Sequence, residues 1–305
     1  MGTRANNLRK TLTSKEAARL LGVSEASVKR WADGDLLPTV KTAGGHRRFR
    51  PEDVAVFRRE RLHKTGRPSA RASVQTHNTH GATLRGSAKR EETAGLMYDV
   101  LVGGHAEEAA AILVSMHLEG AGVSALADEV LCPAMRRVGD LWHQGELSVA
   151  QEHVATRAAL EALRALRASL HTHAAHGRRA VCCAAEEDFH ELPVQVAALV
   201  LEARGWEVVN LGTSTPFYAL AEAIERFAPR LVCVAATILE GLDRAAREYG
   251  EARKAAARFG AGVVLGGAGF AEEGVRRRFP AELHAEDFRQ LEEFAVSLAE
   301  EGEAS

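Results

Sequence analysis

From Arg178 onwards, short apolar runs alternate with amphipathic stretches of helical period. Buried strands that alternate with helices form a parallel sheet with both faces covered, which excludes an all-α or all-β fold for this segment. We therefore predict a doubly wound, Rossmann-like α/β domain over residues 176–305. The apolar runs are 180–185, 207–212, 231–237 and 262–267, and the helical stretches between them are 194–204, 217–228 and 243–259.

Ligands of doubly wound sheets bind beyond the carboxyl ends of the strands. The segments that follow the predicted strands are rich in polar residues and glycine, so we expect any ligand-binding residues of this domain to lie there. These segments are EEDFHELP (186–193), LGTSTP (211–216), ATILEG (236–241) and GGAGF (266–270).

The four cysteines, Cys132, Cys182, Cys183 and Cys233, lie in apolar surroundings without CxxC spacing. Cys182 and Cys183 are neighbours in a predicted strand, so their side chains should point to opposite faces of the sheet. The sequence shows neither a secretory signal nor an apolar run of about 18 residues. We expect reduced core cysteines in a cytoplasmic bacterial protein without a membrane partner.

Residues 91–175 are predicted to form a bundle of three or four helices, because apolar residues recur at helical spacing between glycine and proline breaks. Residues 64–90 are rich in Ser, Thr, Gly and Arg and contain hardly any apolar side chains. Such a segment cannot bury enough surface to offset its ordering entropy, so we predict a flexible linker there.

Residues 1–90 are strongly basic, with 20 Lys and Arg against 7 Asp and Glu, a net charge of +13. The remainder of the chain carries −15. A basic segment on an acidic body indicates contact with a polyanion such as DNA, although a solvated basic tail would give the same count.

Residues 1–63 contain the pattern of a helix-turn-helix. Thr13 or Ser14 can cap a first helix, Gly22 can form the turn, and Ser24 can cap a second helix. The second helix would enter the major groove of DNA, so we expect the protein to be associated with the nucleoid. Its predicted DNA-facing side chains are Ser27, Lys29 and Arg30.

A basic wing is predicted over Gly44-Gly45-His46-Arg47-Arg48-Phe49, where two glycines turn the chain and Phe49 anchors the returning strand. This motif resembles the wing of MerR-type DNA-binding domains. The resemblance implies a winged helix-turn-helix that binds a double-stranded operator as a dimer or larger homo-oligomer. A phage-type excisionase or a non-DNA adaptor of the same fold is the alternative. The wing residues predicted to contact DNA are Lys41, His46, Arg47 and Arg48.

Three motifs follow predicted strands of the α/β segment: Asp188-x-His190, Thr237-x-Leu239 and Gly266-Gly267. Together they resemble the cobalamin-binding domain of methionine synthase, mutases and their regulators. The resemblance implies that His190 is the lower cobalt ligand, that Asp188 holds its other ring nitrogen, and that the remaining residues make room for the nucleotide tail. Two positions depart from the family pattern: Pro193 replaces glycine and Thr237 replaces serine. A histidine of this kind, taken alone, is more often a surface residue.

A fourth motif lies in the helical segment, where nine residues separate Trp142 from Glu152-His153. It resembles the upper cap of the CarH/LitR family of adenosylcobalamin-dependent photoreceptors. The resemblance implies that Trp142, Val149, Glu152 and His153 surround the adenosyl group, and that His143 becomes the upper cobalt ligand after illumination. The alternative is that Trp142 and His153 belong to the bundle core and that His143 is a solvent-exposed residue.

These resemblances predict a non-enzymatic, light-responsive transcriptional regulator, most simply a repressor, with adenosylcobalamin as its chromophore. It would bind DNA as a dimer or tetramer in the dark and release it after photolysis of the cobalt–carbon bond. Two alternatives remain open: a light-independent regulator that senses cobalamin or another tetrapyrrole, and a corrinoid carrier of a methyl-transfer system.

Overall fold

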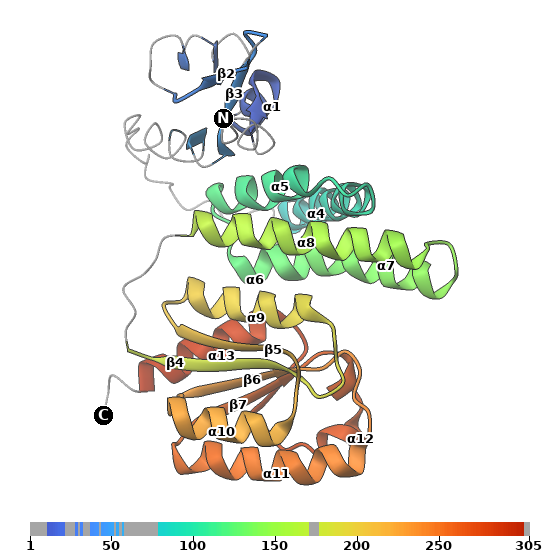
Figure 1. Cartoon of the computed structure of the whole chain (residues 1–305), viewed down its shortest axis with the longest axis vertical. Coiled ribbons are helices and arrows are strands. Elements are labelled where there is room, and N and C mark those ends of the chain that lie inside the picture. The colour runs from blue at the N-terminus through green and yellow to red at the C-terminus, as the bar shows by residue number, and fades with distance from the viewer. Residues whose placement is uncertain are drawn as a thin grey trace, which may run out of the picture.

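The computed structural model shows a small winged helix-turn-helix, a helical bundle and an α/β domain, which confirms the predicted fold class (Figure 1). None of the helices in the described part of the chain has the length and apolar character that a membrane span requires. The structure describes residues 11–21, 28–29, 31–32, 37–42, 44–51, 53–54, 57, 79–170 and 177–301.

The N-terminal domain contains a three-stranded antiparallel sheet in the order β1-β3-β2. Its first helix begins with a capping box: the Thr13 hydroxyl accepts the Glu16 N–H at 3.2 Å, and the Glu16 carboxylate accepts the Thr13 N–H at 2.5 Å. Thr13 is therefore the cap, of the two candidates. Phe49 is fully buried, as its predicted anchoring role requires. The elements are β1 (Leu12–Thr13), α1 (Ser14–Leu21), β2 (Val40–Lys41) and β3 (Arg47–Phe49).

The helical bundle starts earlier than the sequence pattern predicts. Its first helix begins at Thr79, so residues 79–90 are helical and the prediction of a linker over 64–90 is wrong for this part. Once the packed end of a helix has formed, each further residue adds a hydrogen bond without a new nucleation cost, so a polar segment can continue it. The helices are α4 (Thr79–Val102), α5 (Ala106–Leu118), α6 (Val123–Leu126), α7 (Cys132–His143) and α8 (Val149–Ser169), with a π-helical turn at Ala127–Leu131.

The α/β domain is a five-stranded parallel sheet in the order β5-β4-β6-β7-β8. Helices α10 and α11 cover one face, and α9 and α13 cover the other (Figure 1). Cys182 packs on the α9 side and Cys183 on the α10 side, which confirms their opposite orientation. The elements are β4 (Arg179–Ala185), α9 (Glu191–Ala203), β5 (Glu207–Thr215), α10 (Phe217–Phe227), β6 (Leu231–Ala235), α11 (Leu242–Arg258), β7 (Gly262–Gly266), α12 (Glu273–Arg276), β8 (Leu283–Ala285) and α13 (Phe288–Glu301).

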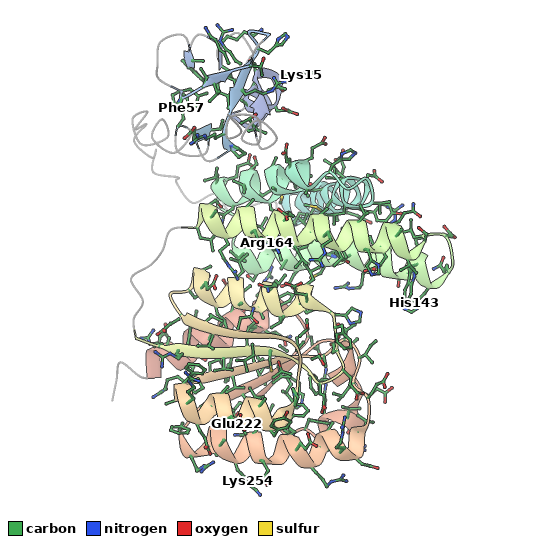
Figure 2. The ribbon with its side chains drawn as sticks, in the orientation of Figure 1. Lys15, Phe57, His143, Arg164, Glu222 and Lys254 are labelled. Atoms are coloured by element: carbon green, nitrogen blue, oxygen red, sulfur yellow. The ribbon has the colours of Figure 1, made fainter. Side chains whose placement is uncertain are left out.

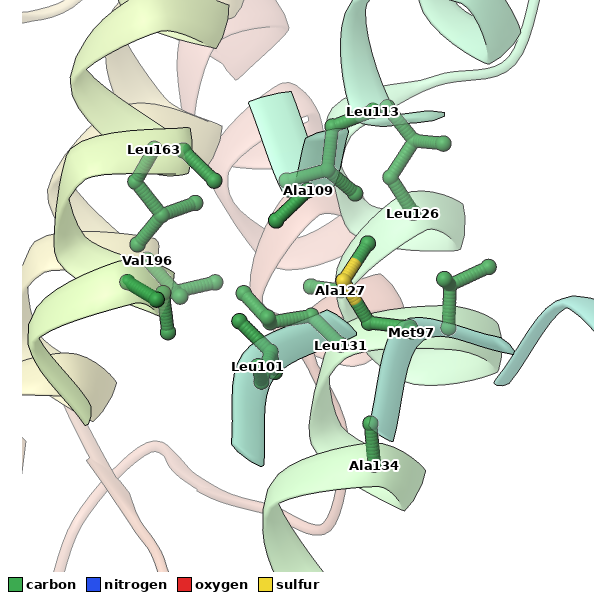
Figure 3. Close-up of a cluster of buried hydrophobic side chains, with 14 of the residues drawn as sticks. Met97, Leu101, Ala109, Leu113, Leu126, Ala127, Leu131, Ala134, Leu163 and Val196 are labelled. Atoms are coloured by element: carbon green, nitrogen blue, oxygen red, sulfur yellow. The ribbon is translucent and has the colours of Figure 1, made fainter. Parts of the chain in front are cut away.

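Helix α9 joins the bundle to the α/β domain. Val196, Leu199 and Val200 pack into the core of the bundle, whereas Val194 and Leu201 pack against the sheet. Figure 3 shows Val196 beside Leu163 of the bundle, within one continuous cluster of buried side chains. A helix that is apolar on both faces in this way is buried between two layers. The two parts therefore share a hydrophobic core.

The strand order reverses at β4, because β5 lies on one side of it and β6 on the other. Helix α9, which follows β4, covers one face of the sheet and α11, which follows β6, covers the other, so the sheet opens at the carboxyl ends of these two strands. The segment that carries Asp188 and His190 starts directly after β4. This topology places the predicted ligand-binding residues at the point where such sheets bind their ligands.

One prediction on stability concerns Gly267, which has a φ of +100° and whose added Cβ would lie 2.4 Å from the carbonyl oxygen of Ala236. We expect Gly267→Ala to lower the free energy of unfolding by about 3 kcal/mol, because it adds backbone strain to a clash with main-chain atoms. Gly139→Ala is the matched control, because a Cβ there meets no atom within 4 Å. This change should raise the free energy of unfolding by about 1 kcal/mol, since alanine has the higher helix propensity. Denaturant titrations followed by circular dichroism measure both. Equal stability of the two variants would contradict the close packing at Gly267.

Candidate functional site

Asp188 and His190 form the centre of the site after β4. The Asp188 side chain is 1% exposed, and its Oδ1 accepts the His190 ring Nδ1–H at 2.6 Å and the His190 backbone N–H at 3.0 Å. The His190 side chain is 49% exposed. Because Nδ1 donates to the carboxylate, the lone pair of the neutral ring lies on Nε2, the nitrogen available to a metal.

The second sequence motif is joined to the first through its backbone. The N–H of Thr237 donates to Oδ2 of Asp188 at 2.6 Å, so one buried carboxylate connects the ends of β4 and β6. Leu239 packs, partly buried, against the core on the α10 and α11 side of the sheet. The Thr237 contact uses the main chain, so the additional methyl group of threonine does not disturb it.

The electrostatics of the pair follow from these contacts. Burial raises the pKa of Asp188, but the hydrogen bonds from His190 and Thr237 outweigh it and lower this pKa overall. The pKa of His190 is raised, first by the hydrogen bond to Asp188, against the opposing effect of burial. A carboxylate behind an imidazole fixes its tautomer and increases its basicity as a ligand.

Gly267 has a structural explanation of its own, because a Cβ there would collide with the backbone of Ala236. At Gly266 a Cβ would lie 3.4 Å from the carbonyl oxygen of Ala285, which is an ordinary contact. Packing therefore requires glycine at 267 and does not require it at 266. The predicted role of both glycines in admitting a nucleotide tail stays a prediction. Pro193 lies in the first turn of α9, where its missing N–H costs little.

The residues of the fourth motif lie where α7 ends and α8 begins. The rings of Trp142 and His143 are neighbours, with centroids 4.7 Å apart, and both side chains are exposed, as is that of Val149. Helix α8 begins with a capping box between Ser148 and Gln151, which positions the residues of its first turns. Because Trp142 and His153 are exposed, the alternative that they belong to the bundle core is wrong.

Glu152 of α8 is held by contacts within the bundle. It accepts a hydrogen bond from the Thr156 hydroxyl at 2.7 Å and lies 3.0 Å from Nδ1 of His153, which also contacts the carbonyl of Val149 at 2.7 Å. The charge of Glu152 also contributes to raising the pKa of His190, although the two residues belong to different domains. Figure 2 shows His143 at the end of the bundle that lies on the same side of the molecule as the carboxyl ends of the strands.

Both halves also expose large apolar side chains. Phe189 of the loop after β4 is 76% exposed, Ile238 of the loop after β6 is 47% exposed, and Trp142 of the bundle is 40% exposed. Exposed apolar side chains mark a binding surface where they form a contiguous patch, so these three are candidates for such a surface. Our sequence interpretation missed Phe189 and Ile238, although each stands inside a motif that it singled out.

The side chains present fit a corrinoid. A single imidazole with a free Nε2, backed by a buried carboxylate, suits a metal whose equatorial positions a macrocycle already fills. The residues that would hold it are His190 below and, from the bundle, Trp142, Val149 and Glu152. The structure brings Asp188, His190 and Thr237 into direct contact, and it places Trp142 and His143 beside each other. Within the part of the chain that the structure describes, the link between the bundle and the His190 loop is electrostatic, because the charge of Glu152 contributes to raising the pKa of His190.

The wing of the N-terminal domain presents basic side chains. Lys41 of β2 and Arg47 of β3 are directly opposite each other in the hairpin, and Lys41 and His46 are exposed. Arg47 and Arg48 are half-buried, and the Thr39 hydroxyl donates to the carbonyl of Arg48 at 3.1 Å. Like charges directly across a ladder are destabilising, which favours a polyanion as the partner of this hairpin. Lys29 is also exposed, whereas Ser27 and Arg30 lie outside the described residues.

The predicted contact between Lys41 and a DNA phosphate can be tested. We expect Lys41→Ala to weaken binding to all DNA duplexes alike and to reduce the slope of log affinity against log salt by about one. Fluorescence anisotropy titrations at several salt concentrations measure this slope. Lys254→Ala, which removes an exposed charge of α11, is the matched control and should leave the slope unchanged. A loss of affinity for one sequence only would contradict a phosphate contact.

Comparison with known proteins agrees with this geometry. Family models described as B12 binding domain match residues 96–167 and 178–285, and a helix-turn-helix domain model matches residues 11–62. The chain is 28% identical over 266 residues to the HTH-type transcriptional repressor CarA of Myxococcus xanthus, covering 86% of this chain and 88% of the relative. It is 30% identical over 245 residues to the HTH-type transcriptional repressor CarH of the same organism, covering 71% of this chain and 75% of the relative.

A solved structure shares the fold of the cofactor-binding part. The monomethylamine corrinoid protein of Methanosarcina barkeri superposes with a TM-score of 0.58 at 18% identity, over 68% of this chain and 99% of its own. At this identity the likeness establishes the arrangement of the bundle and the sheet, and nothing about activity.

Proposed function

The chain belongs to the CarH type of helix-turn-helix transcriptional repressors with B12-binding domains, and from this premise we propose that it is a light-responsive regulator with adenosylcobalamin as its chromophore. That it is a cobalamin-binding transcription regulator follows from the family itself. The light response, the adenosyl form of the cofactor and the roles of individual residues are the proposal.

The observation that carries the proposal is the pair of exposed rings at Trp142 and His143, at the end of the bundle that lies on the same side of the molecule as the carboxyl ends of the strands (Figures 1 and 2). Bound adenosylcobalamin supplies a cobalt–carbon bond that green or blue light breaks. His190 would hold the cobalt from below, and Trp142 would cover the adenosyl group. His143, beside Trp142, would provide an imidazole for the upper face once the adenosyl group has left.

Glu152 and His153 would bind the polar part of the adenosyl group. The Glu152 carboxylate can accept hydrogen bonds from ribose hydroxyls, and its contacts with Thr156 and His153 orient it for this purpose. Val149, exposed in the first turn of α8, would provide apolar contact. Because these residues belong to the bundle and His190 belongs to the α/β domain, the same ligand would favour one arrangement of the two domains over others.

We propose that this arrangement supports a dark-state homo-oligomer, a dimer or tetramer, whose tethered N-terminal domains bind one operator together. Linked binding raises the effective concentration of each N-terminal domain near the DNA. When the domains shift after illumination, the oligomer would dissociate and the operator would be released. The proposed domain limits are those of the sequence prediction, with the bundle extended to Thr79.

An absorption spectrum of the purified protein, loaded with adenosylcobalamin in the dark and then illuminated, tests the proposal directly. A light-induced spectral change that persists, and that matches the spectrum of a cobalamin with two histidine ligands, supports it. A stable dark spectrum without a light-induced change favours the light-independent cobalamin regulator. A corrinoid carrier is disfavoured, since both curated relatives are named as transcriptional repressors and the chain carries a helix-turn-helix domain.

A further inference from the structure

We propose that Ser214 is a positioning residue for the His190 imidazole, because it holds the loop that presents Asp188 to that ring. Ser214 is the next-to-last residue of β5, which is the neighbouring strand of β4, and it lies where the pairing of these two strands is irregular. The inference rests on the proposed ligation of cobalt by His190. Ser214 lies in the segment 211–216, where ligand-binding residues were expected, but none of the three cobalamin-type motifs includes it.

Ser214 makes two hydrogen bonds to the His190 loop. Its hydroxyl accepts the backbone N–H of Glu187 at 3.1 Å, and its own N–H donates to the carbonyl of Asp188 at 2.9 Å. The two bonds enclose the peptide unit between Glu187 and Asp188. The side chain of Asp188 is thereby held where it reaches both His190 and Thr237.

The local backbone shows that this loop needs to be held. Glu187 has a φ of +67° and Ser214 a φ of +48°, which are left-handed conformations that non-glycine residues adopt at a cost. The pairing of β5 with β4 is also irregular: Cys183 pairs with Gly212, whereas Ala185 pairs with Thr215. The additional residues in β5 carry Ser214 out of the ladder and across to the loop.

The other contacts of the loop do not replace those of Ser214. Arg244 lies 3.3 Å from a carboxylate oxygen of Glu187 and 3.4 Å from one of Glu186, but the Arg244 and Glu187 side chains are about half exposed. Exposed ion pairs between flexible side chains are weakened by solvent and salt, whereas Ser214 bonds the backbone of the loop itself at two points, the Glu187 N–H and the Asp188 carbonyl. The hydroxyl of Ser214 is therefore expected to contribute more than Arg244 to the loop conformation.

A purely structural role for Ser214 makes a different prediction from a positioning role. Ser214→Ala removes the hydroxyl and keeps the strained φ, whereas Ser214→Gly removes the hydroxyl and relieves the strain. If only backbone strain matters, the glycine variant should bind cofactor as well as the wild type does. If the hydroxyl positions the His190 loop, both variants should hold the cofactor less firmly, although the glycine variant stays folded.

The experiment uses full-length protein labelled with ¹⁵N-histidine and loaded with cob(II)alamin. In electron paramagnetic resonance, a nitrogen ligand splits the high-field lines into triplets when it is ¹⁴N and into doublets when it is ¹⁵N. Doublets in the wild type identify an imidazole as the ligand, whereas persistent triplets come from the cofactor's own benzimidazole. Unfolding of the unloaded proteins, followed by circular dichroism, serves as the check on folding.

We expect both Ser214 variants to show a smaller doublet fraction and to bind cob(II)alamin roughly 10- to 100-fold more weakly than the wild type. Ser297→Ala, which removes an exposed hydroxyl bonded to the carbonyl of Phe294, is the matched control and should behave as the wild type. Wild-type doublets with unchanged variants would overturn the role of Ser214, as would a loss in the alanine variant alone. Triplets in the wild type would instead overturn the proposed ligation by His190.

Discussion

Replacement of His190 with alanine is expected to weaken the binding of adenosylcobalamin by about 100-fold or more. The wild-type imidazole is held by a 2.6 Å hydrogen bond to the buried Asp188, so its Nε2 is oriented before the cofactor arrives. Alanine removes this ligand, and the hydrogen bond that orients it is lost as well. Absorbance titrations in the dark, with a range of cofactor concentrations, measure the affinity.

Two further variants make this result specific. Asp188→Asn keeps the side-chain shape but loses the negative charge, and it should weaken binding by roughly 10- to 100-fold. His105→Ala removes an exposed histidine of the bundle and should leave binding unchanged. Retention of the cofactor at wild-type affinity by His190→Ala would show that the cobalt is not bound through this residue.

Illumination of the cofactor-loaded protein is expected to produce the second large effect, a loss of operator affinity of about 100- to 10,000-fold. The physical reason is that one tethered N-terminal domain binds DNA much more weakly than several domains that bind together. The DNA probe is the duplex that the dark protein selects from a random-sequence pool. Analytical ultracentrifugation and fluorescence anisotropy, before and after green light, measure mass and affinity on the same sample.

Two controls distinguish the effect of light from the effect of the cofactor. Unloaded protein under the same lamp should show no change. Trp142→Ala should bind adenosylcobalamin and form less of the dark oligomer, because the exposed indole no longer covers the adenosyl group. If mass and DNA affinity depend on cofactor but are the same in dark and light, the protein is a cobalamin sensor without a light response.

Local patterns allowed much of this molecule to be predicted. The first four strands of the parallel sheet, the helices between them and the wing were predicted because their spacing or turn residues depend on neighbours along the chain. The opposite faces of Cys182 and Cys183 follow from strand geometry alone and are confirmed. The strand β8 and the helix α13 were missed: β8 has only three residues, too few for a visible period.

The linker prediction shows that composition alone does not decide whether a polar segment is helical. Residues 79–90 are polar, yet they continue a helix whose later residues Met97 and Leu101 are fully buried. Composition records what a segment can bury by itself, whereas a helix that is already packed can extend through residues that bury little.

The sequence by itself determined the kinds of domain, their order and the residue types available for a corrinoid and for DNA. Only the tertiary structure decided which of those residues interact. The Thr237 N–H bonds the Asp188 carboxylate, the charge of Glu152 acts on His190, and Ser214 bonds the backbone of the His190 loop. The reason is that periodicity and motifs report contacts between residues close in the chain. Contacts between the ends of different strands depend on strand order and register, which are set by packing of the whole sheet.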